Sequence, residues 1–298
     1  MLRKLGGETS VHSQRSSDPQ HLSPAAAITR QHDRDRFQTA LFAPAARREA
    51  LFALYAFNYE IARVREAVTQ PMLGRIRLEW WRENIAAAYE NSPVRRNDIV
   101  EALTSAIRER GLTRAHFDRL VDAREADFDE DPPANLAVLE AYAEGTSSQL
   151  VYLALEALGV SDPAAREAGH HIGIAYALTG LLRALPVLTA SGRPVVPPDI
   201  AARAGLDLGD YRALRSSNAL RAAVAEIAAA AEAHLQAAPE RPRAVARAAL
   251  PALLPAVIAG RWLKRLKKAR HDPFDPGLIR PDPLQSWRLA TASLRRRF

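Results

Sequence analysis

The sequence predicts an all-α fold in a single domain. Alanine-rich runs such as Ala222 to Leu235 have high intrinsic helix propensity. Strand signals are scarce, and there is neither an internal repeat nor a glycine-rich phosphate loop. A chain of 298 residues is long for one average domain, but helical folds of this size often form one unit. Apolar residues recur at helical spacing in Leu51, Leu54, Tyr55, Ile61 and Val64.

The order of the helices follows from the residues that interrupt them. From Phe37 onward the chain is predicted to be helical, with breaks where Pro, Gly, Asn and Ser cluster. Thr113 and Asp162 stand where helix N-caps are expected, and Pro163 suits the first helical position. The predicted breaks lie at 70–71, 91–93, 111, 131–133, 159–163, 191–198 and 239–242.

The two ends of the chain differ in composition from the middle. Residues 1–34 are rich in Ser, Gln, His and charge and lack the apolar core of a signal peptide, so they are predicted to be a disordered leader. The helical domain is expected over 35–270 and a basic C-terminal tail over 271–298. The most apolar stretch, 248–260, is shorter than the ~20 residues of a membrane span and contains two prolines, so no transmembrane helix is predicted.

Charge and cysteine content narrow the classes of function. The net charge is +7, but Arg261 to Phe298 holds eleven Lys or Arg against three Asp, so the basicity belongs to the C-terminal region. Such a segment suits an anionic membrane or an acidic partner, and a merely solvated arginine-rich surface is the alternative. The absence of cysteine excludes disulfides, thiolate metal sites and a cysteine nucleophile. We expect no nucleic-acid partner.

Two segments resemble the signature motifs of the squalene/phytoene synthase family. The first is the run Ala-Leu-Tyr-Ala-Phe at 53–57 with its continuation to Glu66, and the second is GIAYALTGLLRALPVLTASGRPVVP at 173–197. The segments 37–51, 77–83, 142–148 and 250–266 resemble further family elements in the same order. The resemblance covers most of residues 36–268 and implies an isoprenoid-synthase-type helical bundle around a central cavity.

The carboxylates of those motifs are nearly all missing. In the family, the first motif carries a DxxxD pattern and the second carries further acids, which hold the Mg²⁺ ions that bind and neutralise diphosphate. When the two motifs are aligned on the residues that match the family, one of the family's acids remains, Glu66, unless Glu60 or Glu79 substitutes for the others. We therefore expect no catalytic residues and no metal or other cofactor. The positions that carry the family's five acids are Ala62, Glu66, Ala184, Val187 and Leu188.

The retained polar residues suggest a different kind of pocket. On a helix, Asn58, Ala62, Arg65 and Glu66 would share one face, and arginines there would favour a diphosphate or lipid phosphate. The alternative is that Arg65 pairs with Glu66 or Glu79 and only closes the bundle. The candidate pocket residues are Tyr55, Asn58, Arg65, Glu66, Tyr142, Ser147, Thr179, Arg183 and Arg193.

Three other clusters carry weaker signals. His170 and His171 are predicted to be structural or at the surface, because adjacent helical positions point about 100 degrees apart. The acidic run 125–131 ends in two prolines and is predicted to be a solvated helix end. Trp80 and Trp81 are predicted to pack rather than to stack on a ligand.

Several segments resemble one branch of the family in particular. The sequences at 56–64, 71–78, 142–148 and 182–186 are similar to the branch that contains the mitochondrial respiratory complex I assembly factor and its alphaproteobacterial relatives. This resemblance implies a non-catalytic factor for assembly of an NADH:quinone oxidoreductase or for lipid handling. Its implied partners are complex I subunits or assembly proteins and an isoprenoid or lipid ligand. Its implied location is cytoplasmic, peripheral on the inner membrane.

Two other functions stay open at the level of sequence. The first is an active prenyltransferase of isoprenoid biosynthesis that condenses two isoprenyl diphosphates head to head, with Mg²⁺ held by Glu66 and other acids. The second is a peripheral lipid-binding protein without an assembly role. Fold alone does not decide among them.

Overall fold

The computed structural model describes residues 22–238 and 245–298. Within these ranges it contains helices and no strand, so the predicted all-α class is confirmed. The helices are α1 (Pro24–His32), α2 (Arg34–Ala40), α3 (Ala45–Ala62), α4 (Pro71–Tyr89), α5 (Asp98–Arg110), α6 (Arg114–Ala123), η1 (Arg124–Phe128), α7 (Leu136–Ala143), η2 (Glu144–Ser148), α8 (Gln149–Ala157), α9 (Pro163–Ala190), α10 (Pro198–Ala204), α11 (Leu208–Arg212), α12 (Asn218–Ala237), η3 (Arg247–Ala249), α13 (Leu250–Leu253), α14 (Pro255–Lys268), α15 (Pro276–Ile279) and α16 (Gln285–Arg295).

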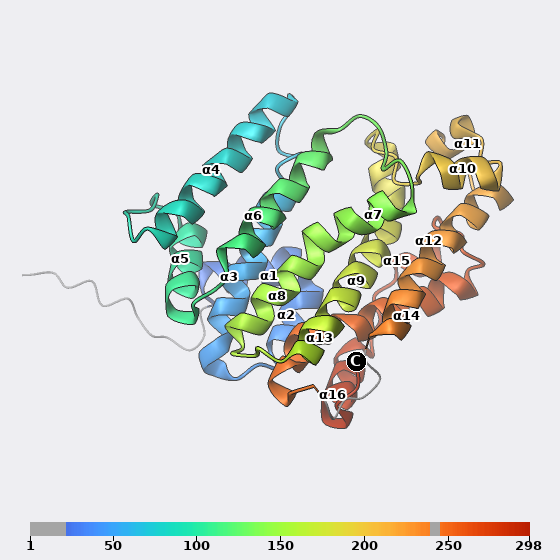
Figure 1. Ribbon diagram of the computed structural model, residues 1–298. Coiled ribbons are helices and arrows are strands. Elements are labelled where there is room, and N and C mark those ends of the chain that lie inside the picture. Colours follow the sequence, from blue (N-terminus) through green and yellow to red (C-terminus); the bar gives the residue numbers. More distant parts are fainter. Residues whose placement is uncertain (1–21, 239–244) are drawn as a thin grey trace, which may run out of the picture.

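The bundle is organised around two long helices that carry the two motifs. The α3 helix lies in a core cluster with α1, α5 and α8, and it is buried over most of its length. The α9 helix contacts α12, α14, α8 and η2 and forms the centre of a second cluster. Figure 1 shows α4, α5 and α6 on one side of this pair and α12, α14 and α16 on the other. The two motif helices therefore lie inside the bundle.

Helix ends agree in part with the turn signals of the sequence. The Asp162 carboxylate accepts a hydrogen bond from the Ala164 N–H with Pro163 at the first helical position, as predicted. Thr113 also stands at the N-cap position of α6, as predicted, but it makes no side-chain capping bond. Its hydroxyl does not cap α6, and both its hydroxyl and its N–H donate to the Glu156 carboxylate instead.

The helix α9 approaches η2 very closely. A Cβ atom added at Gly173 would lie 2.5 Å from the Ser148 Cα, whereas one added at Gly180 would meet nothing within 4 Å. The η2 segment is a single π-helical turn, and its Ser148 hydroxyl donates to the His170 carbonyl of α9. Glycine at 173 thus permits contact between the second motif and the segment at 142–148 that the sequence singled out.

The disordered leader predicted for 1–34 extends too far. In α1, Ala25 and Ala26 are buried and the Thr29 hydroxyl donates to the Phe52 carbonyl of α3. The Ser23 cap and the proline at position 24 are helix-start signals of the same kind as those that begin later helices. Residues 1–21 lie outside the described residues.

The basic region 271–298 is folded against the domain. Its helix α16 packs on α14 through Leu289, which is fully buried against Leu254 and Ile258. Among the described residues, one helix, α9, is long and apolar enough to cross a membrane by length and composition alone. Half of that apolar window is buried in the bundle, as expected of a core helix.

Candidate functional site

The two motif helices meet around the side chain of Arg36, which comes from α2. The Arg36 guanidinium lies 4.7 Å from the ring centre of Tyr176 on α9 and 5.8 Å from that of Tyr55 on α3. It also donates to the Asp33 carboxylate, at 2.8 Å. A cation between two aromatic faces and one carboxylate is a satisfied buried charge. We call this group, Asp33, Arg36, Tyr55 and Tyr176, the interior cluster.

The electrostatics of the interior cluster keep the arginine charged and both phenols neutral. Burial raises the pKa of Tyr55 and of Tyr176 above the usual phenol value, and the Asp33 carboxylate adds to both shifts. Burial by itself would lower the pKa of Arg36, but the Asp33 carboxylate together with Tyr176 and Tyr55 outweighs it, and the net shift is upward. Neither phenol is therefore poised to exchange a proton near neutral pH.

Little space remains beside the interior cluster. The cavity lined by Arg36, Tyr55, Ser147 and Tyr176 has a volume of about 10 Å³. One water molecule needs roughly 10–15 Å³ on this measure, so this cavity is far too small for a prenyl chain. The Ser147 hydroxyl is buried without a hydrogen-bond partner in the described structure, as is the side-chain oxygen of Asn58.

The first-motif positions do not form the shared helical face that the sequence predicted. The α3 helix ends at Ala62, so Arg65 and Glu66 lie in the following turn. The Glu66 side chain is exposed, and within the described residues Arg65 forms no ion pair with Glu66 or Glu79. The helix ends because its backbone closes in turn-type hydrogen bonds from Arg63 onward. Both the shared face and the proposed pairing of Arg65 were wrong.

The second-motif positions also fail to converge. Val187 is exposed and does not fill a cavity, and Leu188 lines a cleft on the far side of α9 from Arg183. Ala184 is half-buried. Thr179 is buried, and its hydroxyl donates to the Ala175 carbonyl of its own helix. These residues offer no oxygen ligands to a metal.

A Mg²⁺ site does not fit the described residues. Across 22–238 and 245–298, no group of three or more His, Asp or Glu side chains is arranged to hold a metal ion. Glu60 and Glu79, the acids nearest in sequence to the first motif, pair with Arg63 and Arg82. The donor set lacks the carboxylate pairs that a magnesium diphosphate site requires.

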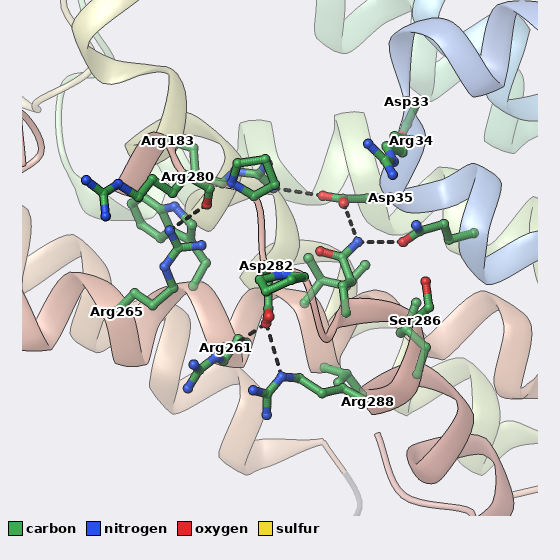
Figure 2. A pocket seen from close by; sticks show the side chains of 18 of the residues that line it. Asp33, Arg34, Asp35, Arg183, Arg261, Arg265, Arg280, Asp282, Ser286 and Arg288 are labelled. Carbon is green, nitrogen blue, oxygen red and sulfur yellow. Dashed lines mark hydrogen bonds and ion pairs between the residues drawn. The ribbon is translucent and has the colours of Figure 1, made fainter. Parts of the chain in front are cut away.

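A wide groove opens on the outer side of α2 and α9. It has a volume of about 660 Å³ and is lined by α2, α14, α15 and α16 as well as Arg183 of α9. Figure 2 shows Arg183 reaching Asp35, which also accepts from the Gln285 amide of α16. We call this the outer groove. Its charged lining residues are Asp33, Arg34, Asp35, Arg183, Arg261, Arg265, Arg280, Asp282 and Arg288.

The outer groove carries more positive than negative charge. Asp282 lies between Arg261, at 3.5 Å, and Arg288, at 3.1 Å. Desolvation opposes the shift, but the Leu284 N–H and the Arg288 guanidinium together lower the pKa of Asp282. Arg34 and Arg280 form no ion pair within the described ranges. Guanidinium groups in such a groove suit a phosphate or other oxyanion.

A third polar group gathers around Asp127, which the sequence placed in a solvated run. This carboxylate is buried and accepts hydrogen bonds from Tyr142, at 2.7 Å, and Arg193, at 2.9 Å. Arg124 donates to Tyr142 and lies 3.5 Å from Asp127. Burial raises the pKa of Tyr142 to about 12. The prediction of a solvated Asp127 was wrong, because the helix η1 turns Asp127 and Phe128 inward, while 129–131 stay exposed.

Tyr142, Arg193 and Leu188 share one cleft with this carboxylate. The cleft lies between the 129–135 loop, α7 and the end of α9 and has a volume of about 470 Å³. Two predicted pocket residues, Tyr142 and Arg193, are therefore brought together in this cleft. Both side chains form hydrogen bonds with Asp127 and neither belongs to the interior cluster. Their polar atoms connect α7 and the loop after α9 to η1.

The remaining clusters have structural contacts. His171 lies 3.0 Å from His234 between their Nδ1 atoms, and His234 also approaches Glu140, at 3.4 Å. Trp81 is buried and packs edge-on against Phe57, as predicted for packing. Sequence reasoning missed Arg36, Asp35 and Tyr176. The alternation of Asp and Arg at 33–36 was the available signal, and the predicted boundary at 34/35 divided it between the leader and the domain.

Comparison with known proteins identifies relatives of two kinds. Complex I assembly factor 6 of Homo sapiens is 32% identical over 268 residues, which cover 88% of this chain and 80% of that protein. The Bos taurus protein is 32% identical over 271 residues, 91% of this chain and 81% of its own. Presqualene diphosphate synthase of Rhodopseudomonas palustris is 31% identical over 212 residues, 69% of this chain and 74% of that protein.

Solved structures and a family model agree on the fold. A dehydrosqualene synthase superposes with a TM-score of 0.79 at 18% identity, covering 91% of this chain and 94% of that one. Squalene synthase HpnC from Alicyclobacillus acidocaldarius gives a TM-score of 0.74 at 20% identity, covering 84% and 94%. The family model described as squalene/phytoene synthase matches residues 29–295. With nearly the whole sequence matched, this chain belongs to the squalene/phytoene synthase family.

Proposed function

We propose that this protein assists the assembly of a respiratory NADH:quinone oxidoreductase and does not catalyse prenyl transfer. The proposal follows the similarity to complex I assembly factor 6 of mammals, which extends over about nine tenths of the chain. Its partners would then be subunits or assembly proteins of that enzyme.

The observation that carries the proposal is the interior cluster. Arg36 and two tyrosines lie between the motif helices, where the cavity volume is about 10 Å³. Four of the five positions that hold acids in the family are Ala62, Ala184, Val187 and Leu188, and the fifth, Glu66, is exposed in a turn. A prenyl diphosphate would find neither room nor metal ligands there.

A lipid or phosphate ligand belongs, in this proposal, to the outer groove rather than to the bundle interior. The groove holds about 660 Å³ and is lined by six arginines and three aspartates. Guanidinium forks bind phosphate without a metal. A protein with this groove would act at the cytoplasmic surface of the membrane that contains the oxidoreductase. A peripheral lipid-binding role without assembly is the second function that this groove favours.

An enzymatic test addresses the prenyltransferase alternative. The purified full-length protein is incubated with farnesyl and geranylgeranyl diphosphate, with and without Mg²⁺ or Mn²⁺, and product and diphosphate are followed by mass spectrometry. We expect the substrates to stay intact. We expect the same result for the variant Ala62→Asp/Ala184→Asp/Leu188→Asp, because Arg36 would still occupy the space between the motif helices. Metal-dependent formation of squalene, phytoene or presqualene diphosphate by the unaltered protein would overturn the proposal.

A genetic test separates assembly from lipid binding. The gene is deleted in the source organism, and NADH:quinone oxidoreductase activity, assembled complex on native gels, carotenoids and hopanoids are measured. We expect loss of the complex with isoprenoids unchanged, and rescue by the unaltered gene. Normal amounts of active complex would refute the assembly role and leave the lipid-binding function.

A further inference from the structure

The C-terminal helix α16 uses only one of its faces to pack on the protein. Leu289 is fully buried against Leu254 and Ile258 of the α13–α14 region, and Ala292, three positions on, packs on the same cluster. These two residues define the inner face of the helix. Figure 1 places α16 at the lower edge of the bundle.

The outer face of α16 is apolar. Leu284 is 51% exposed, Trp287 is 72% exposed and Leu294 is 78% exposed. Their spacings of three and seven residues place them in one stripe along the side opposite Leu289. Single exposed apolar residues are ordinary, but a stripe that includes a tryptophan marks a contact surface.

Unpaired cations lie at the C-terminal end of this stripe and on the neighbouring helix α14. Arg295, Arg296 and Arg297 follow Leu294 directly and are exposed. Three exposed lysines, Lys264, Lys267 and Lys268, lie on α14, which packs against α16. None of these six side chains forms an ion pair in the part of the chain that the structure describes. Their charge is therefore available to an anionic partner.

We infer that the outer face of α16, with its terminal arginines, docks this protein on an anionic lipid bilayer. An apolar stripe beside cations on a surface helix is the arrangement of an interfacial helix. Tryptophan favours the boundary between headgroups and acyl chains, and Lys and Arg are attracted to anionic lipids. The inference rests on the membrane location proposed above but not on the assembly role.

The docked orientation also places the outer groove relative to the bilayer. The helix α16 contributes Gln285, Ser286 and Arg288 to the groove lining, so groove and stripe are two sides of one element. A bilayer held by Trp287 and Leu294 would thus lie beside a groove lined by guanidinium groups. An acidic protein surface is the alternative occupant of the stripe, and it predicts no binding to lipid alone.

The test is sedimentation of the full-length protein with vesicles. One set contains phosphatidylcholine only, and the other is rich in phosphatidylglycerol. We expect binding to the anionic vesicles that weakens with salt, and a blue shift of tryptophan emission on binding, since Trp287 is the most exposed tryptophan. Binding of Trp287→Ser/Leu294→Ser should be weaker by about tenfold or more. Arg295→Gln/Arg296→Gln/Arg297→Gln should lose most of the preference for anionic vesicles.

A matched control uses another pair of exposed apolar residues. Met72 is 62% exposed and Ile76 is 58% exposed on α4, at similar helical spacing but on a different element. Met72→Ser/Ile76→Ser should bind vesicles as the unaltered protein does. Absence of vesicle binding, equal binding to both lipid compositions, or equal losses in the α4 and α16 variants would each overturn the inference. Vesicle binding without any effect of the gene deletion on the oxidoreductase would leave it intact and reject only the assembly role.

Discussion

Two ion pairs that start from neighbouring residues of one segment differ in the burial of their arginines. Asp33 and Arg36 lie 2.8 Å apart and belong to the interior cluster, where the Arg36 side chain is 11% exposed. Asp35 and Arg183 also lie 2.8 Å apart, but in the outer groove, where the Arg183 side chain is 43% exposed. Equal geometry thus serves two purposes. The inner pair completes the packing between the two motif helices, and the outer pair stays accessible from the outer groove.

Removal of the two arginines tests this contrast most directly. Arg36→Ala leaves Asp33 without its partner and empties the space between Tyr55 and Tyr176, so we expect a loss of about 3 kcal/mol in the free energy of unfolding. Arg183→Ala should lower the same free energy by less than about 1 kcal/mol, because its pair is half-exposed. Urea denaturation followed by circular dichroism measures both. Similar losses in the two variants would contradict the contrast.

The Asp127 network tests whether burial of a carboxylate or its position beside a cleft decides how much stability is lost when its charge is removed. Asp127 lines a cleft, as Asp35 does, yet its side chain is buried and accepts from Tyr142 and Arg193. Asp127→Asn keeps the shape but removes the charge opposite Arg193, and we expect a loss of about 2 kcal/mol in unfolding free energy. The exposed neighbour Asp129 is the control, and Asp129→Asn should change stability little. A loss that is as large for Asp129 would mean that burial is not the cause.

The sequence predicted the scaffold better than the site. Helical periodicity, the proline breaks and the Asp162 cap depend on local chemistry, so the all-α class and most helix positions follow from them. The interior cluster depends on α2 being folded over α3 and α9, and no local pattern indicates which arginine lies between the two motif helices. The end of α3 at Ala62 likewise separates Arg65 and Glu66 from Asn58, which helical spacing alone would have kept together.

Two glycines of α9 allow a packed position and an open position to be compared within one helix. At Gly173 a new Cβ would meet the Ser148 backbone, which cannot move aside as a side chain can. Gly173→Ala should therefore lower the free energy of unfolding by about 1–2 kcal/mol through overpacking. Gly180 has open space around it, and Gly180→Ala should raise stability by up to about 1 kcal/mol, because alanine is the better helix former. Thermal melts of both variants measure the opposite signs, and a destabilising Gly180→Ala would contradict them.

The smallest expected effect on stability comes from the histidine cluster. Its exposure is intermediate between that of the interior cluster and that of the outer groove. Desolvation first, and then His170 and His234, lower the pKa of His171 below its ordinary value of about 6.5. The folded protein therefore resists protonation that the unfolded chain accepts. Stability from this group is complete above pH 6.5 and is lost as the pH falls below it. The groups that act on His171 are His170, His234 and Glu167, while Glu144 lies beside His170 and Glu140 beside His234.

His171→Gln should reduce this acid sensitivity without abolishing it. The His171 and His234 Nδ1 atoms are 3.0 Å apart, so the N–H of one ring donates a hydrogen bond to the unprotonated Nδ1 of the other, and protonation of both rings breaks the contact. Melting temperatures above and below pH 6.5 are compared for the unaltered protein and the variant. The acid-induced drop should be smaller in the variant, and only modestly so, because His171 is partly open to water and solvent screens its neighbours. An unchanged drop would assign the acid sensitivity to other groups and leave this cluster with a packing role alone.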